Sequence, residues 1–138
     1  MGVTAPRVVV IGATEGLRIA RAGRLADHYG VPRLPAVDVL IRRQPLPADG
    51  YVIDGAPRLL DRVARVGGLL PALAFADLVV HLREAGRTEG EDAGRILRYY
   101  EARGALAGFR PDASDGDLIL AIDAARRGRT AADPPRWP

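Results

Sequence analysis

The sequence predicts an α/β protein with three layers: a parallel sheet with helices on both faces. Two observations lead to this prediction. Residues 7–11 and 78–82 are nearly continuous apolar runs rich in β-branched side chains, as in strands that are buried on both faces. Segments between such runs repeat their apolar residues at helical spacing, so that strands and helices alternate along the chain.

The first half of the chain contains a strand, a helix and two short elements. The strand is predicted at residues 7–11, and a helix follows over residues 17–29. That helix is predicted to end at Gly30, because glycine readily adopts the left-handed conformation at a helix end. A very short strand is predicted at residues 33–35, and a short helix at residues 37–41.

The middle of the chain repeats the order of strand and helix twice. A buried strand at residues 51–54 precedes a helix over residues 59–70, whose apolar side chains form a one-sided stripe. The strand at residues 78–82 precedes a second helix, which begins near Glu89 and ends at the capping glycine Gly104.

The last elements complete one domain. A strand is predicted at residues 106–109, and Ser114 with Asp117 three residues later opens the final helix in the manner of a capping box. We therefore assign residues 1–128 to a single domain. Residues 129–138 are predicted to be a flexible, proline-rich tail.

Composition restricts the classes of function. The chain has 138 residues, of which 48% are hydrophobic, and it has no cysteine, so disulfides, zinc-thiolate sites and cysteine nucleophiles are excluded. We expect a cytoplasmic protein, since neither a signal peptide nor a membrane-spanning run is recognisable. The two histidines, His28 and His81, lie too far apart in the sequence to indicate a metal site.

All basic side chains of the chain are arginines. They number 20 against 17 acids and give a net charge of +3, but they are spread along the whole length and interleaved with the acids. Aromatic residues make up only 5%, so the stacking surface of a nucleic-acid-binding protein is not expected. The absence of lysine also removes the ammonium group on which a conventional triphosphate-binding loop relies.

Residues 50–58 read G-Y-V-I-D-G-A-P-R. This pattern predicts a buried strand that ends in an acid and is followed by a tight turn and an arginine. These groups would lie at an edge of the sheet suited to binding phosphate. Four further segments occur in a fixed order with this segment: R-V-V-V-I-G, R-L-A-D-H-Y-G-V-P-R-L, A-D-L-V-V-H-L and Y-Y-E-A-R-G-A-L. Taken together, residues 7–127 resemble the adenylate kinases, in which the segment after the second buried strand typically reads D-G-F-P-R. The resemblance implies a P-loop NTPase core.

The resemblance also implies a nucleotide site and residues that act in it. Arg18 and Asp54 would be catalytic, with Asp54 assisting a magnesium shell, and ATP and Mg²⁺ would be the cofactors. The implied phosphate-binding or nucleotide-binding residues are Gly12, Gly16, Arg18, Arg42, Gly55, Arg58 and Arg95. No resident metal site is expected in the protein itself.

Each of the main candidates also has an ordinary structural interpretation. Asp54 is equally explained as an acid that caps the following loop, and Arg58 as an arginine in the first turn of a helix. Arg18 is better explained as an exposed residue on a helix that also carries Arg21 and Arg24.

The loop after the first strand departs from the family pattern G-x-P-G-[AS]-G-K-G-T. Leu17 replaces a glycine, and Arg18 replaces the lysine with a planar fork that is not an equivalent point charge. Glu15 would place a carboxylate beside the phosphates, and like charges about 4 Å apart repel by roughly 4 kcal/mol at an effective dielectric near 20. We therefore expect Glu15 to point away from the loop and ATP binding to be impaired.

The segments that close over the nucleotides in the family are shortened here. The segment over the monophosphate is reduced to residues 42–49, and the lid is reduced to residues 84–90. Because closure excludes water during phosphoryl transfer, the loss of both segments indicates that efficient transfer has been abandoned.

Three interpretations follow. The preferred one is a degenerate adenylate-kinase-like protein, a pseudokinase with a regulatory or scaffold role, that binds a nucleotide or another phosphorylated ligand, or contacts a protein partner, without ordinary turnover. The second is a minimal nucleoside-monophosphate kinase that transfers phosphate from ATP to AMP or a related acceptor. The third is a scaffold or homodimer that binds no ligand. None of them involves nucleic acid or a membrane.

Overall fold

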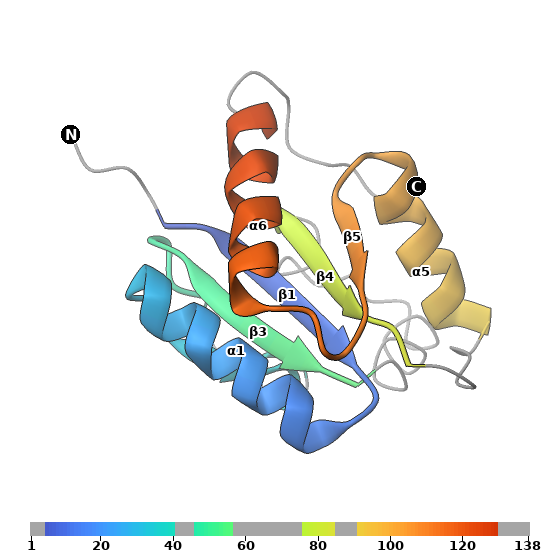
Figure 1. Cartoon of the computed structure of the whole chain (residues 1–138), viewed down its shortest axis with the longest axis horizontal. Coiled ribbons are helices and arrows are strands. Elements are labelled where there is room, and N and C mark those ends of the chain that lie inside the picture. Colours follow the sequence, from blue (N-terminus) through green and yellow to red (C-terminus); the bar gives the residue numbers. More distant parts are fainter. Residues whose placement is uncertain (1–4, 41–45, 57–75, 85–90, 130–138) are drawn as a thin grey trace.

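The computed structural model describes residues 5–40, 46–56, 76–84 and 91–129. Outside residues 57–75, which the structure does not describe, the elements follow the order of strands and helices expected from the sequence (Figure 1). They are β1 (Arg7–Gly12), α1 (Glu15–Tyr29), β2 (Arg33–Pro35), α2 (Ala36–Leu40), β3 (Tyr51–Gly55), β4 (Leu78–Leu82), α5 (Glu91–Ala102), β5 (Leu106–Phe109) and α6 (Asp115–Arg129). The predicted helix at residues 59–70 lies outside the described residues, as do residues 130–138 of the predicted tail.

Five parallel strands form one sheet in the order β2-β3-β1-β4-β5. The central strand β1 pairs with β3 on one side, where Val10 is in register with Asp54. On the other side it pairs with β4, where Ile11 is in register with His81. The prediction of a parallel sheet is confirmed.

The two faces of the sheet are covered by different helices, because successive side chains of a strand point to opposite faces. Val8 and Val10 of β1 pack in one core with residues of α1 and α6. Val9 and Ile11 pack in a second core with residues of α2 and α5. The predicted layers of helix, sheet and helix are therefore present. None of the described helices is long and apolar enough to cross a lipid bilayer.

The predicted ends of three helices are confirmed in detail. Gly30 follows α1 with a φ of 67°, and Gly104 follows α5 with a φ of 70°, so both glycines hold the left-handed conformation that closes a helix. At the start of α6 the Ser114 hydroxyl accepts a hydrogen bond of 3.1 Å from the backbone N–H of Asp117.

The order of the strands places a topological switch point at the centre of the sheet. The connection that leaves β1 carries α1 and leads toward β2, whereas the connection that leaves β4 leads through α5 to β5 on the other side. Their helices cover opposite faces of the sheet. Ligands of open α/β sheets bind in the crevice at such a point, outside the carboxyl ends of the strands. The carboxyl ends of β1 and β4 are thus where a ligand is expected.

Polar side chains join α1 to α6, which lie side by side on one face of the sheet (Figure 1). Arg21 and Arg24 bind the two oxygens of Asp115 at 2.7 and 2.5 Å. Burial acts to raise the pKa of Asp115, but the hydrogen bonds from Arg24 and Arg21 outweigh it and hold that pKa below its usual value. The Tyr29 hydroxyl donates a hydrogen bond of 2.8 Å to Asp123, and burial together with this carboxylate raises the tyrosine's pKa.

We expect Asp115→Asn to lower the free energy of unfolding by about 1–2 kcal/mol at neutral pH, a modest value because the side chain is 33% exposed. The pKa of Asp115 is lower in the folded state than in the unfolded chain, so its contribution is complete above the unfolded value of about 3.9. The contribution is lost as the pH falls through the lower, folded-state value. Urea titrations from pH 7 to pH 3 test this: a difference between variant and wild type that is constant down to pH 3 contradicts it.

Candidate functional site

A buried carboxylate lies at the carboxyl end of β3. Asp54 is 3% exposed, and its side chain is on the face of the sheet that α1 covers, like that of Val52. Arg33 of β2 donates a hydrogen bond of 2.6 Å from Nε to Oδ2 of Asp54. Arg18 of α1 places its Nε 3.6 Å from Oδ1. The carboxylate therefore joins β3 to its neighbouring strand and to the first helix.

Arg18 is directed into the protein. Its side chain is 11% exposed, and its Nη1 donates a hydrogen bond of 2.6 Å to the carbonyl oxygen of Gly12, the last residue of β1. The interpretation of Arg18 as an exposed helix residue is therefore wrong. The guanidinium instead bridges the ends of β1 and β3, because a carbonyl oxygen and a carboxylate are both acceptors for its fork of donors.

The Arg18–Asp54–Arg33 cluster carries excess positive charge, since one carboxylate faces two guanidinium groups. Within the described residues, Nε of Arg18 is buried without a hydrogen-bond partner. Charges in a poorly hydrated site interact more strongly than in water. The carboxyl edge between β1, β3 and β2 is therefore a favourable place for an additional anionic group.

The turn between β1 and α1 is short. Only Ala13 and Thr14 separate the two elements, and the N–H of Arg18 already donates a helical hydrogen bond of 3.0 Å to the carbonyl of Thr14. A phosphate-cradling loop works because several backbone N–H groups point inward together. Here the helix begins at Glu15, three residues before Arg18, so the N–H of Arg18 is used by the helix and is not available to a ligand.

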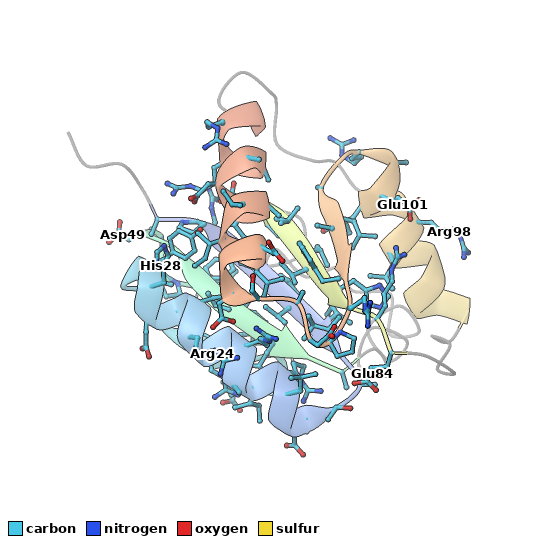
Figure 2. The ribbon with its side chains drawn as sticks, in the orientation of Figure 1. Arg24, His28, Asp49, Glu84, Arg98 and Glu101 are labelled. Atoms are coloured by element: carbon cyan, nitrogen blue, oxygen red, sulfur yellow. The ribbon has the colours of Figure 1, made fainter. Side chains whose placement is uncertain are left out.

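One N–H group of this turn is occupied by an internal anion. Glu84, which follows β4, accepts a hydrogen bond of 3.2 Å from the N–H of Thr14. Figure 2 shows Glu84 just beyond the end of β4, near the turn after β1. Glu15 is exposed at the start of α1. A phosphate group at the N–H of Thr14 would have to displace the Glu84 carboxylate, because like charges at this distance repel.

A cavity of about 370 Å³ opens on the other face of the sheet, between β4, β5 and α5. Its most buried lining residue is His81, which is 5% exposed and occupies the penultimate position of β4. Figure 2 labels Arg98 and Glu101 on α5 and Glu84 beyond β4, which contribute to the wall. The full lining is His81, Arg83, Glu84, Gly94, Leu97, Arg98, Glu101 and Leu106.

The structure brings together only part of the predicted set. Gly12, Arg18 and Asp54 lie at one edge of the sheet, and Gly55 is buried at the end of β3 beside them. Gly16 lies in the first turn of α1, where an added Cβ would meet no atom within 4 Å, so no close approach requires a glycine there.

The side-chain positions of three predicted phosphate-binding residues are not described by the structure. Arg42 and Arg58 lie outside the described residues. Arg95 belongs to α5, but its side chain is not among those that the structure describes.

Arg33, Glu84 and the cavity residues did not emerge from the sequence as site residues. Arg33 stands in a strand of three residues, and its partner Asp54 is 21 positions later, so no local spacing connects them. His81 was predicted only as part of the strand at residues 78–82, and it lies buried in β4. The available signal was the change from apolar to polar residues at the end of β4, in the sequence L-V-V-H-L-R-E.

The residues at this edge do not fit the magnesium shell implied by the adenylate-kinase resemblance. Both carboxylate oxygens of Asp54 face guanidinium groups, so a divalent cation near it would have to displace one arginine and approach the other. Among the described residues, no group of three or more histidine, aspartate or glutamate side chains is arranged to hold a metal ion.

No protein-family model matches the chain, and no curated protein matches it. The parallel sheet and the side chains at its carboxyl edge are therefore the structural features that bear on function.

We expect Asp54→Asn to lower the free energy of unfolding by about 3–5 kcal/mol, because it leaves two guanidinium groups without their shared carboxylate. The matched control is Asp112→Asn, which removes the carboxylate from an exposed pair with Arg110 and should change stability by less than about 0.5 kcal/mol. Urea unfolding followed by circular dichroism measures both values. Equal, small effects would mean that the buried cluster contributes nothing to the fold.

Proposed function

We propose that this protein binds a nucleotide or another phosphorylated small molecule at the carboxyl edge of its sheet and does not carry out ordinary phosphoryl transfer. It is an adenylate-kinase-like protein in which the binding scaffold is retained and the transfer machinery is lost. The proposal combines the resemblance of residues 7–127 with the geometry of the edge.

The observation that carries the proposal is the position of the Arg18 guanidinium. Arg18, in the first turn of α1, stands at the position of the missing lysine, and its Nη1 donates a hydrogen bond of 2.6 Å to the Gly12 carbonyl. In a phosphate-binding loop this cation reaches outward to the terminal phosphates. Here it would have to leave both a carbonyl and the Asp54 carboxylate, at a cost comparable with breaking a buried ion pair.

Two further features support binding without transfer. The Arg18–Asp54–Arg33 cluster has one more cation than anion, which favours an anionic ligand at the edge. The position of Glu84 on the N–H of Thr14 opposes a phosphate chain that wraps around the turn, as a donor triphosphate must do. A ligand with a single phosphate group does not have to reach the N–H of Thr14, so it need not displace the Glu84 carboxylate from that group.

The minimal kinase is the competing function, and it needs Asp54 near a magnesium ion and Arg18 on the donor phosphates. In the structure these two groups are paired with each other and with Arg33. This arrangement favours the binding function.

Calorimetric titration with AMP, ADP and ATP in the presence of Mg²⁺ tests the proposal, together with a coupled assay for ADP formation from ATP and AMP. We expect saturable binding of at least one nucleotide. A ligand at a hundred times its dissociation constant should stabilise the protein by about 2.7 kcal/mol, which raises Tm by roughly 9 °C for a chain of this length. We expect ADP formation no faster than in the blank.

Arg18→Lys is the informative variant, since it restores the missing residue type and keeps the charge. It should remain inactive, because the early start of α1 has removed the loop around it. ADP formation by the wild type that Arg18→Ala abolishes would establish the kinase instead. The absence of binding and of a Tm shift with every nucleotide would overturn the binding function.

A further inference from the structure

The cavity between β4, β5 and α5 lies beside the same switch point, but on the face opposite Arg18 and Asp54. His81 points to the α5 face, since its neighbours Val80 and Leu82 both pack in the core under α1 and α6. Glu84 lines the cavity and also binds the N–H of Thr14, so the cavity adjoins the turn after β1. Its volume of about 370 Å³ is near the lower limit of small-molecule sites.

Two arginines of the cavity wall lie over glycines that leave room for them. A Cβ added to Gly108 would lie 2.5 Å from Nε of Arg83, and one added to Gly94 would lie 3.3 Å from Nη1 of Arg98. Real Cβ atoms are essentially never found as close as the first of these distances. Any other residue at Gly108 would therefore move the Arg83 guanidinium from its place.

These two guanidinium groups are not neutralised. Among the residues that the structure describes, neither Arg83 nor Arg98 has an ion-pair partner, in contrast to Arg18, Arg21, Arg24 and Arg33. A guanidinium fork matches the oxygens of a phosphate group and binds it through paired, charge-assisted hydrogen bonds. The same wall carries the carboxylates of Glu84 and Glu101, so the two forks suit an oxyanion whose oxygens lie on the arginines and away from these acids.

The rest of the wall indicates what the oxyanion is attached to. Glu101 lies one helical turn from Arg98 and lines the same cavity, and its carboxylate can accept hydrogen bonds from hydroxyl groups of a ligand. Leu97 and Leu106 offer apolar surface to the body of the ligand, and His81 adds a polar group at the buried end.

We propose that this cavity holds the phosphate group of a small hydroxylated phosphate ester, a sugar phosphate or a nucleoside monophosphate, on Arg83 and Arg98. The inference rests on the proposed function and makes it specific. The cation of the turn after β1 is bound inside the fold, and the phosphate group is instead bound on the α5 face of the sheet by arginines outside that turn.

The test is calorimetric titration of the full chain with ribose 5-phosphate, AMP and inorganic phosphate. Arg83→Ala and Arg98→Ala should each weaken binding about tenfold or more. The matched control is Arg110→Ala, which removes the same charge from an exposed pair outside the cavity and should change affinity less than twofold.

Two glycine variants separate a specific site from a general effect of charge, because they leave the net charge unchanged. Gly108→Ala should weaken binding several-fold by displacing Arg83. Gly94→Ala should weaken it about twofold by shifting Arg98, while the helix itself becomes more stable, so a loss of binding cannot come from unfolding. Thermal unfolding of each variant checks the fold.

Comparing the affinities of these ligands shows whether the bound oxyanion is that of a phosphate ester or free phosphate. Tighter binding of AMP or ribose 5-phosphate than of inorganic phosphate, with the difference reduced by Glu101→Gln, supports the phosphate ester, whereas equal affinities overturn it. If the wild type binds but Arg83→Ala and Arg98→Ala bind equally well, the cavity assignment is wrong and the proposed function stands. If the wild type binds none of these ligands and no nucleotide, the proposed function fails and this inference fails with it.

Discussion

The arrangement of the carboxyl edge depends on the buried carboxylate of Asp54. Burying a single charge in a protein core is unfavourable unless it is paired, and Asp54 is paired with guanidinium groups from two other elements. Arg33 approaches from β2 and Arg18 from α1, so the carboxylate fixes the outer strand and the first helix against β3. This constraint also determines where the cation nearest to the turn after β1 can point.

The chemistry of the turn follows from that constraint and from the early start of α1. A phosphate-binding loop needs free N–H groups, a cation that reaches outward and no competing anion. In this protein the N–H of Arg18 donates to a helical hydrogen bond, and its guanidinium donates to the Gly12 carbonyl. The Glu84 carboxylate accepts a hydrogen bond from the N–H of Thr14. Internal groups thus make contacts that a ligand would make in such a loop, and this is the basis for proposing binding without transfer.

The two faces of the sheet have different electrostatic roles near the switch point. On the α1 face the arginines are paired with Asp54 and Asp115 within the fold and contribute to its stability, and the Arg18–Asp54–Arg33 cluster keeps one cation in excess. On the α5 face Arg83 and Arg98 border a cavity without ion-pair partners among the described residues. A protein that uses arginine for every basic position can serve both roles with one residue type, because the same fork binds a carboxylate inside the fold or a phosphate at its surface.

The sequence by itself determined the strands β1, β3, β4 and β5, the order of elements, the parallel sheet and the ends of three helices. These features follow from local periodicity and from single residues such as Gly30, Gly104 and Ser114, so a linear pattern is enough to predict them. Only the tertiary structure decided the direction of Arg18, the partner of Asp54, and the cavity beneath α5. Each of these depends on residues from different strands and helices that meet only when the sheet is assembled, and a side chain's direction is set by the neighbours it finds there.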